Sequence, residues 1–247
     1  MSGNITSFGL QCISILLEVG LVIAAVCCRH RRRYVSVAFY VALLLASELV
    51  RVCTWRTYGS SSPQYFYAYW TTDFLLVVGA FILVCFFFQR ALAHEEKMWG
   101  FVRLLLFFVF ILVIGISCLS FSRNYNHLVT TFVIEFNQNL YFTCLVLNTL
   151  LYILLQQINS ADDELGLLVC GVGIQFAGPT ATWALLTLTT GQDFARSLMT
   201  YMMPFCTMGM LLVWGYTIGR VKDKQTETEI APHGAPVLAE ATVDVQG

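Results

Sequence analysis

The chain has 247 residues, of which 57% are hydrophobic and only 12% are charged, against about a quarter charged in an ordinary soluble domain. Its net charge is −1, and its basic residues are not interleaved with aromatic residues in the manner of a nucleic-acid interface. The composition therefore excludes an ordinary soluble domain and a nucleic-acid partner, and it predicts a bundle solvated by the lipid bilayer.

Seven apolar runs are long enough to cross a membrane, because a helical span needs about 20 mostly apolar residues. The runs lie near residues 8–28, 35–53, 66–89, 101–121, 128–155, 165–188 and 194–218. They are continuous and do not alternate like the strands of a barrel, so they are helices. We predict an all-α, polytopic membrane bundle over residues 1–224 and a polar, disordered tail over residues 225–247.

Lysine and arginine residues are divided unevenly between the two sides of the predicted bundle. Ten of the 14 lie on one side and four on the other. The richer side is cytoplasmic by the positive-inside rule, which places the N-terminus outside and the C-terminus and tail in the cytoplasm. The first run has a dense basic block after it and none before it, so we expect a retained anchor of a multi-pass cell-membrane protein and no cleaved signal peptide.

Charged residues stand on both sides of the polar loop that joins the second and third runs. Glu48 and Arg51 lie three residues apart and share one helix face, so they either neutralise each other or contribute to a pocket. Tyr65, Tyr69 and Asp73 recur every four residues and form one stripe. The stripe is either an aromatic belt with one hydrogen-bonded acid or the lip and floor of an outward-facing pocket.

The fourth and fifth runs differ sharply in polarity. The fourth is apolar from Leu104 to Ile114, and a helix that is apolar all round is expected at the periphery of the bundle. The fifth carries Glu135, Gln138 and Asn139 on one face. Because Asn and Gln side chains hydrogen-bond between membrane helices, we expect the fifth helix near the centre.

The sixth run combines polar and small residues near the middle of the membrane. Gln175 precedes Gly178 and Pro179. This pattern predicts either a notch in which a neighbouring helix packs closely or a bend that exposes backbone carbonyl groups to a cavity.

Most ionisable and amide side chains of the spans fall in the predicted outer half of the bundle, two lie nearer the middle, and the inner half contains almost none. Buried acids without partners take up a proton, so this outer group can be polar without being fully charged. We predict an outward-facing, ligand-binding pocket. Its residues are Glu18, Glu48, Arg51, Tyr69, Asp73, Glu135, Gln138 and Gln175.

The sequence lacks the residues that several known cofactors and activities of membrane helix bundles require. A retinal Schiff base needs a lysine within the last span, but Lys97, Lys222 and Lys224 all lie at the cytoplasmic margin. The four histidines fall in loops, helix ends or the tail, which argues against haem or zinc inside the bundle. No catalytic triad, CxxC pair or phosphate-binding glycine loop can be assembled within the spans, and the common motifs of G-protein-coupled receptors are missing. We expect no cofactor, no metal and no enzymatic activity.

The run Tyr65-Phe66-Tyr67-Ala68-Tyr69-Trp70, followed by Asp73, resembles a pattern in small, uncharacterised bacterial seven-helix membrane proteins, notably those of acidobacteria. The resemblance covers the second to fourth spans. It implies a location in a bacterial inner membrane, and it implies no particular activity.

These observations favour a membrane protein that senses a ligand or forms a subunit of a larger membrane assembly, with another membrane protein or a second copy of itself as partner. The alternative is a small-solute or proton-coupled transporter, which commonly has internal repeats, broken helices and a polar path to both sides. The sequence has few helix breaks and an apolar inner half, so it favours the first hypothesis.

Overall fold

The computed structural model describes residues 2–27, 31–59, 62–93, 95–121, 128–157, 162–188 and 202–220. The helices are α1 (Ser2–Cys27), α2 (Arg31–Tyr58), α3 (Pro63–Ala91), α4 (Glu96–Phe121), α5 (Leu128–Gln157), α6 (Asp163–Leu188) and a C-terminal helix, Met202–Arg220. Within the described ranges there is no strand, and the all-α prediction is confirmed. The predicted tail, 225–247, and the start of the seventh predicted run, 194–201, lie outside the described residues.

Six helices in the described part of the chain are long and apolar enough to cross a membrane, namely α2 to α6 and the C-terminal helix. In α1, the described side chains form a shorter apolar stretch, Ile13–Val26. The chain therefore has the architecture of a multi-pass membrane protein, and a crossing by α1 stays a prediction.

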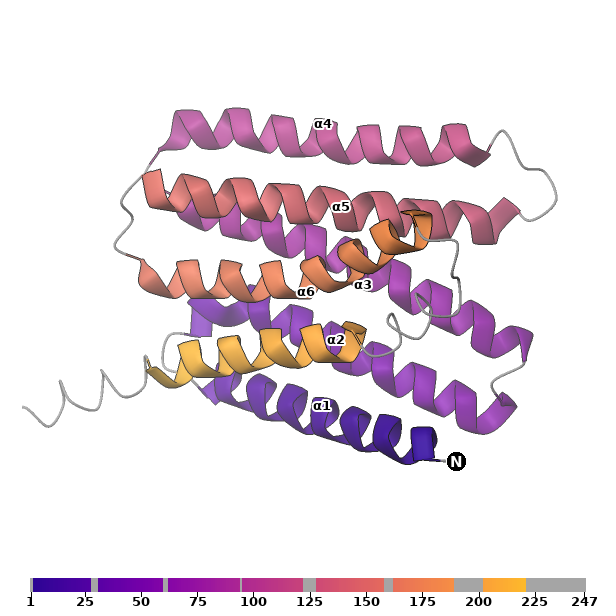
Figure 1. Ribbon diagram of the computed structural model, residues 1–247. Coiled ribbons are helices and arrows are strands. Elements are labelled where there is room, and N and C mark those ends of the chain that lie inside the picture. Colours follow the sequence, from indigo (N-terminus) through magenta and orange to yellow (C-terminus); the bar gives the residue numbers. More distant parts are fainter. Residues whose placement is uncertain are drawn as a thin grey trace, which may run out of the picture.

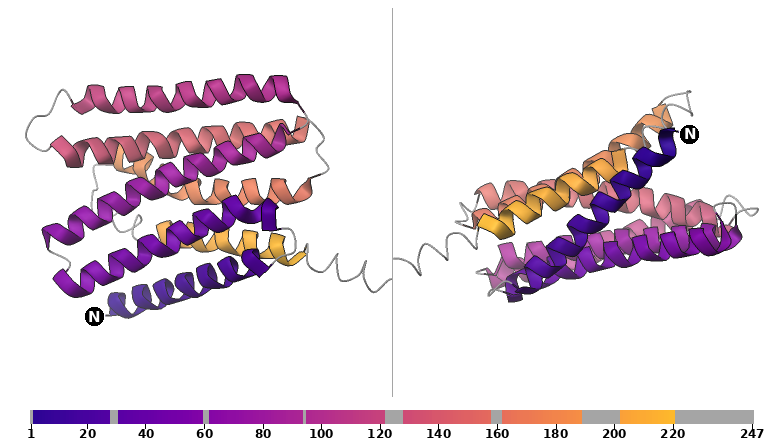
Figure 2. Two further views of the ribbon diagram at one scale, coloured as in Figure 1. Left: turned by 180° about the vertical axis from the view of Figure 1, so that it is seen from behind. Right: turned by 90° about the horizontal axis from the view of Figure 1, so that it is seen from below.

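Successive helices run antiparallel along one common direction (Figure 1). Seen from below, α2 and α3 lie in one layer, α6 and the C-terminal helix lie in another, and α1 crosses them obliquely (Figure 2). α4 lies at one edge, against α5 and α3, and only 17% of its apolar window is buried. The peripheral position predicted for the fourth span is confirmed.

The centre of the bundle is occupied by α3, which contacts α2, α4, α5 and α6. α5 contacts α3, α4 and α6, in agreement with the inner place predicted for the fifth span, although its window is only 39% buried, against 61% for α3 and α6. The reason for the lower burial is that α5 is amphipathic within the membrane. One face packs against α3 and α6, and the opposite face exposes large apolar side chains such as Phe142, Val146 and Leu150.

A short connection sets α2 beside α3 at one end of the bundle. Gly59 has a φ of 80°, a left-handed conformation that glycine adopts without a steric penalty, and it turns the chain after α2. The hydroxyl of Ser62 then accepts a hydrogen bond from the Tyr65 N–H at 3.1 Å, and Pro63 takes the first helical position, both typical of a helix start. We call this the Arg51 end of the bundle, and the opposite end the Arg90 end.

The C-terminal helix packs against α6 at Gly171, where the absence of a side chain leaves room for Trp214. A Cβ added at Gly171 would lie 2.6 Å from Nε1 of Trp214, so the indole fills the space that a side chain would occupy. Trp214 is fully buried, donates from Nε1 to the Leu168 carbonyl at 3.0 Å, and meets the Tyr40 ring edge-on. Gly171 therefore provides a packing notch. Pro179 lies inside α6, which changes direction in its second half (Figure 1), as expected for a proline inside a helix.

Candidate functional site

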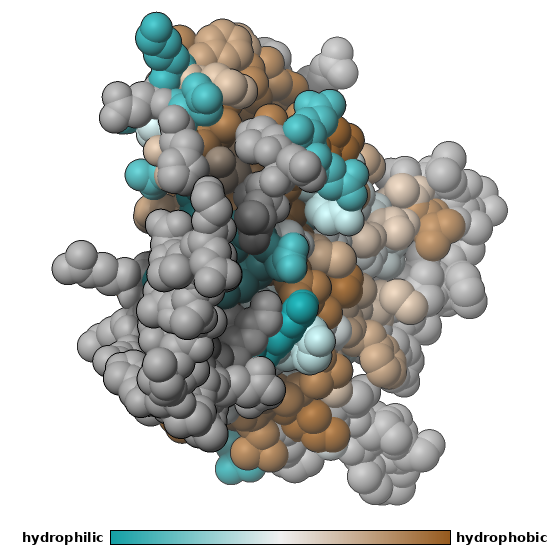
Figure 3. Space-filling model, turned by 90° about the vertical axis from the view of Figure 1, so that its left-hand side faces the viewer, coloured by the Kyte–Doolittle hydropathy of each residue, from teal (hydrophilic) through white to brown (hydrophobic). Residues whose placement is uncertain are grey.

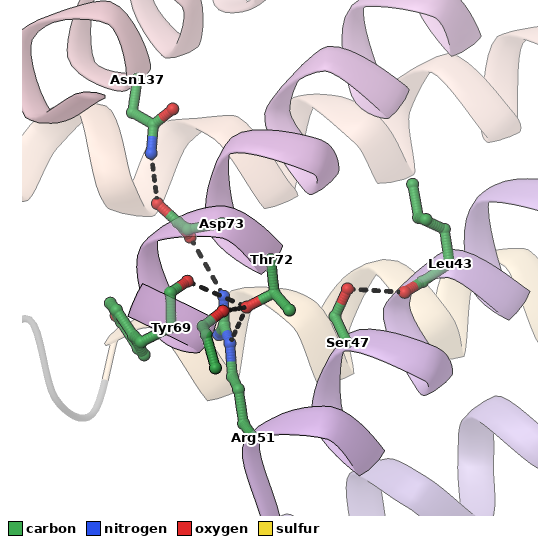
Figure 4. Close-up of polar contacts among 8 residues, drawn as sticks. Leu43, Ser47, Arg51, Tyr69, Thr72, Asp73 and Asn137 are labelled. Atoms are coloured by element: carbon green, nitrogen blue, oxygen red, sulfur yellow. Dashed lines mark hydrogen bonds and ion pairs between the residues drawn. The ribbon is translucent and has the colours of Figure 1, made fainter. Parts of the chain in front are cut away.

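A polar cluster at the Arg51 end joins α2, α3 and α5 (Figure 4). Arg51 donates from Nε to Thr72 Oγ1 at 2.8 Å, and its Nη2 lies 3.4 Å from Asp73 Oδ1. The other carboxylate oxygen of Asp73 accepts a hydrogen bond from Asn137 Nδ2 at 2.6 Å. We call Arg51, Tyr69, Thr72, Asp73 and Asn137 the Arg51 cluster.

An aromatic stripe on α3 adjoins the Arg51 cluster. The guanidinium carbon of Arg51 lies 4.4 Å from the centroid of the Tyr69 ring, which is within the range of a cation–π contact. Tyr65 lies one turn earlier, and its ring centroid is 6.5 Å from that of Tyr69. The predicted stripe is therefore present and leads from partly buried tyrosines to the buried Asp73. The Arg51 side chain keeps 22% of its surface exposed.

Among the described residues no hydrogen bond or ion pair within 4.0 Å joins Glu48 to Arg51, although the two side chains are close enough to interact electrostatically. The Arg51 guanidinium extends across to α3, where Thr72 and Asp73 both offer oxygen atoms. The Oε2 atom of Glu48 is buried and has no hydrogen-bond partner among the described residues. Arg51 is thus held by an inter-helix pair, which a spacing rule within one helix does not reveal.

Glu18 lies in the interior and outside the Arg51 cluster. Its side chain is fully buried on α1, and its Oε1 accepts a hydrogen bond from Ser14 Oγ at 3.2 Å. Its Oε2 has no partner among the described residues, and its carboxyl group is close enough to that of Glu48 for the two to interact electrostatically. Glu18 is therefore a buried acid of α1 that lies apart from the Arg51 cluster.

Gln175 lies on α6 with 7% of its surface exposed, and its Oε1 also lacks a partner in the described part of the chain. No contact given by the structure joins it to the Arg51 cluster. It is an interior acceptor, as its position in the sixth run suggested, but it belongs to another part of the bundle.

The predicted polar face of α5 points away from the Arg51 cluster. Asn139, on that face, donates to Ser117 of α4 at 3.5 Å, so the face turns toward α4 instead of α3. Glu135 and Gln138 are partly buried, and among the described residues neither has a hydrogen bond or ion pair to the cluster. Glu135 and Gln138 were predicted to line the pocket, and the structure does not bring them to the Arg51 cluster.

Asn137 is the functional candidate that the sequence analysis missed. It is 2% exposed and lies on a buried face of α5 with Tyr141, Cys144 and Asn148. These positions are three or four residues apart, or one helical turn, so the signal was a second polar stripe on the same helix. The Nδ2 atom of Asn148 donates to the Val169 carbonyl of α6 at 3.0 Å, which shows that this stripe faces the interior.

The Arg90 end carries a second ion-pair network. Arg90 of α3 donates from Nε and Nη2 to Asp162 Oδ2, at 3.1 and 2.8 Å, and its Nη2 lies 3.7 Å from Glu164 Oε2. Tyr34 of α2 donates to the same Glu164 oxygen at 3.1 Å. Figure 3 shows this end, where hydrophilic side chains gather around a recess. This network lies at the helix ends, where Arg90 was expected to close its span, and pairs residues that the sequence analysis had not joined.

Two changes at Asp162 separate its roles as an ion-pair partner and as a helix cap. Its Oδ1 accepts from the Leu165 N–H at 3.2 Å, at the start of α6. Asp162→Asn keeps a capping oxygen and loses the charge, whereas Asp162→Ala loses both. We expect Asp162→Ala to cost about 1 kcal/mol more, the usual contribution of an N-cap. Thermal unfolding of both variants in nanodiscs measures the difference, and equal melting temperatures would show that the cap contributes nothing.

Comparison with protein-family models, curated proteins and solved structures gives no match for this chain. Among the described residues, no group of three His, Cys, Asp or Glu side chains is arranged to hold a metal ion. The Arg51 cluster combines a guanidinium that is 22% exposed, a neighbouring tyrosine ring and a buried carboxylate.

Proposed function

We propose that this membrane protein is a ligand-sensing module that binds a small organic anion at the Arg51 cluster. The supporting observation is the loose engagement of Arg51. Its Nη2 is 3.4 Å from Asp73, and its side chain is still 22% exposed. A guanidinium has five N–H donors and binds carboxylates in a bidentate manner. A ligand carboxylate can therefore make a better pair with Arg51 than Asp73 does.

The same geometry couples binding to the packing of helices. Both carboxylate oxygens of Asp73 on α3 make contacts between helices: one pairs with Arg51 of α2, and the other accepts a hydrogen bond from Asn137 of α5. A ligand that pairs with Arg51 in place of Asp73 weakens the contact between α2 and α3 and leaves the contact between α3 and α5 intact. The two arrangements differ in their contacts with the ligand, which is the requirement for a ligand-driven shift in conformation.

The Arg51 cluster lies at the outer side of the predicted bundle, beside aromatic rings of α3. By the distribution of Lys and Arg, the Arg51 end faces outward, so the ligand arrives from outside the cell or from the periplasm of a bacterium. The rings of Tyr65, Tyr69 and Trp70 supply an apolar wall for the rest of the ligand. The signal passes to a membrane partner or a second copy within a larger assembly.

The test is a thermal-shift screen of the protein in nanodiscs with small aliphatic and aromatic carboxylates. At a concentration near 100 times Kd, a true ligand stabilises the folded state by about 2.7 kcal/mol. Arg51→Lys should weaken the shift because it loses the planar fork, and Arg51→Gln should abolish it. The control is Arg103→Gln, at an exposed position on α4. A carboxylate shift that persists in Arg51→Gln contradicts the proposal, as does a screen without any shift.

Transport is the second candidate function, and one observation favours it. Ion-pair networks close both ends of the bundle, and between them lie buried oxygen atoms without partners in the described part of the chain, on Glu18, Glu48, Asn148, Gln175 and Thr180. Such oxygens could line a path for a proton or a polar solute. Uptake of a carboxylate by proteoliposomes, driven by a pH gradient and lost in Glu18→Gln, would favour transport over sensing.

A further inference from the structure

A cavity of about 490 Å³ opens at the Arg90 end, between α5, α6 and the end of the C-terminal helix. Its lining includes Tyr152, Gln156, Asp163, Leu167, Cys170 and Arg220. The recess on this end of the molecule is seen in Figure 3. This cavity lies at the opposite end of the helices from the Arg51 cluster, and the proposed function makes no use of it.

The cavity is lined by one basic side chain, Arg220, and by two acidic ones, Asp162 and Asp163. In the described part of the chain neither Arg220 nor Asp163 forms an ion pair within 4.0 Å. The neighbouring Asp162 is already engaged by Arg90 and by the start of α6. Charge complementarity therefore favours an occupant that carries both an anionic and a cationic group.

The lining changes from charged to apolar along the helices. Seven residues separate Asp163 from Cys170 on α6, which corresponds to about 10 Å at 1.5 Å per residue. The charged part lies at the helix ends, and the part near Leu167 and Cys170 lies within the apolar span Asp163–Thr182. Tyr152 and Cys170 are exposed, so in a multi-pass membrane protein the cavity opens sideways toward lipid.

We propose that this cavity binds one phospholipid with an ethanolamine headgroup. Its phosphate pairs with Arg220, its primary ammonium donates to the Asp163 carboxylate, and its glycerol and acyl chains lie against Leu167 and Cys170. A charge-assisted hydrogen bond to a carboxylate needs an N–H donor, which the trimethylated headgroup of phosphatidylcholine lacks. Phosphatidylglycerol offers the phosphate but leaves Asp163 facing an uncharged alcohol. The bound lipid joins α6 to the C-terminal helix.

The test is native mass spectrometry of the delipidated protein after addition of an equimolar mixture of phosphatidylethanolamine, phosphatidylglycerol and phosphatidylcholine. The wild type should retain phosphatidylethanolamine roughly fivefold more than either competitor, the effect of one charge contact at a membrane surface. Arg220→Gln should reduce retention of both phosphatidylethanolamine and phosphatidylglycerol. Asp163→Asn should remove the preference between them, and Arg220→Lys should keep it, which separates loss of the site from loss of folding.

The control is Arg103→Gln, which removes an exposed positive charge from α4, outside the cavity, and should leave lipid retention unchanged. Equal retention of the three lipids by the wild type would overturn the proposal. An unchanged preference in Asp163→Asn would also overturn it. Soluble O-phosphoethanolamine is the third arm, and displacement of the lipid by low millimolar amounts would show that the headgroup alone is recognised and that the lipid is not the ligand.

Discussion

Neutralising Asp73 alone is expected to destabilise the protein by about 2 kcal/mol, below the 3–5 kcal/mol seen when a fully buried pair is broken. The smaller value follows from the partial exposure of Arg51, whose side chain is 22% accessible. Asp73→Asn preserves the shape of the side chain and can still accept the hydrogen bond from Asn137. The loss therefore reports on a guanidinium left without its counter-charge among packed helices.

The double variant Arg51→Gln, Asp73→Asn should recover much of this loss. Once both charges are gone, neither helix holds an uncompensated ion, and two neutral amide groups can hydrogen-bond across the interface. Unfolding free energies of the wild type, the two single variants and the double variant in detergent micelles give the coupling energy. We expect about 1–2 kcal/mol, within the range for residues in direct contact.

A matched cycle distinguishes the pairing along α2 from the pairing across helices. Glu48→Gln combined with Arg51→Gln tests the partner that lies three residues away on the same helix. Because Arg51 donates to Thr72 and Asp73, the coupling with Glu48 should be less than half the coupling with Asp73. Equal couplings in the two cycles, or none in the first, would contradict the geometry of the Arg51 cluster.

The helical architecture could be predicted because lipid leaves few alternatives. An apolar run of sufficient length in a bilayer must satisfy its own backbone hydrogen bonds, so composition and run length alone identify the spans. The structural helices extend beyond the predicted runs, as when the run 66–89 becomes Pro63–Ala91. The added residues are the capped, polar turns at the helix ends, where hydropathy no longer marks the helix.

Only the part of the site that lies on a single helix could be predicted from the sequence. The stripe of Tyr65, Tyr69 and Asp73 follows from the period of α3 alone. The partners of Asp73 come from α2 and α5, which are 22 and 64 residues away in sequence. Which helices become neighbours depends on packing across the whole bundle, and a spacing rule does not contain that information.

The same limit explains the network at the Arg90 end. Arg90 and Asp162 are 72 residues apart, and each reads in the sequence as an ordinary charged residue at a helix boundary. Only the arrival of α3 and α6 at the same end of the bundle brings them together. The distribution of charge along the sequence therefore shows which residues are charged at each end and does not show which of them pair.

Truncating Trp214 to alanine is expected to cost about 3–5 kcal/mol, the usual loss for a large buried aromatic side chain. Within a membrane the loss comes mainly from packing contacts, because lipid is itself apolar. Trp214 is fully buried against Gly171, and its Nε1 donates to the Leu168 carbonyl. Trp214→Phe should cost less, since it keeps most of the ring volume and loses a hydrogen bond of about 1 kcal/mol.

Two further variants determine whether the notch and the indole act together. Gly171→Ala places a methyl group where the indole lies and should lower the melting temperature in the wild type, because overpacking costs about 1–3 kcal/mol. In Trp214→Ala the same methyl group enters an empty space and should be harmless or stabilising. Tyr216→Ala, at a position 62% exposed on the same helix, is the control for a general effect of shortening an aromatic side chain. If Gly171→Ala destabilises both backgrounds equally, the C-terminal helix is not held on α6 by this contact, and its docking must depend on residues elsewhere along the helix.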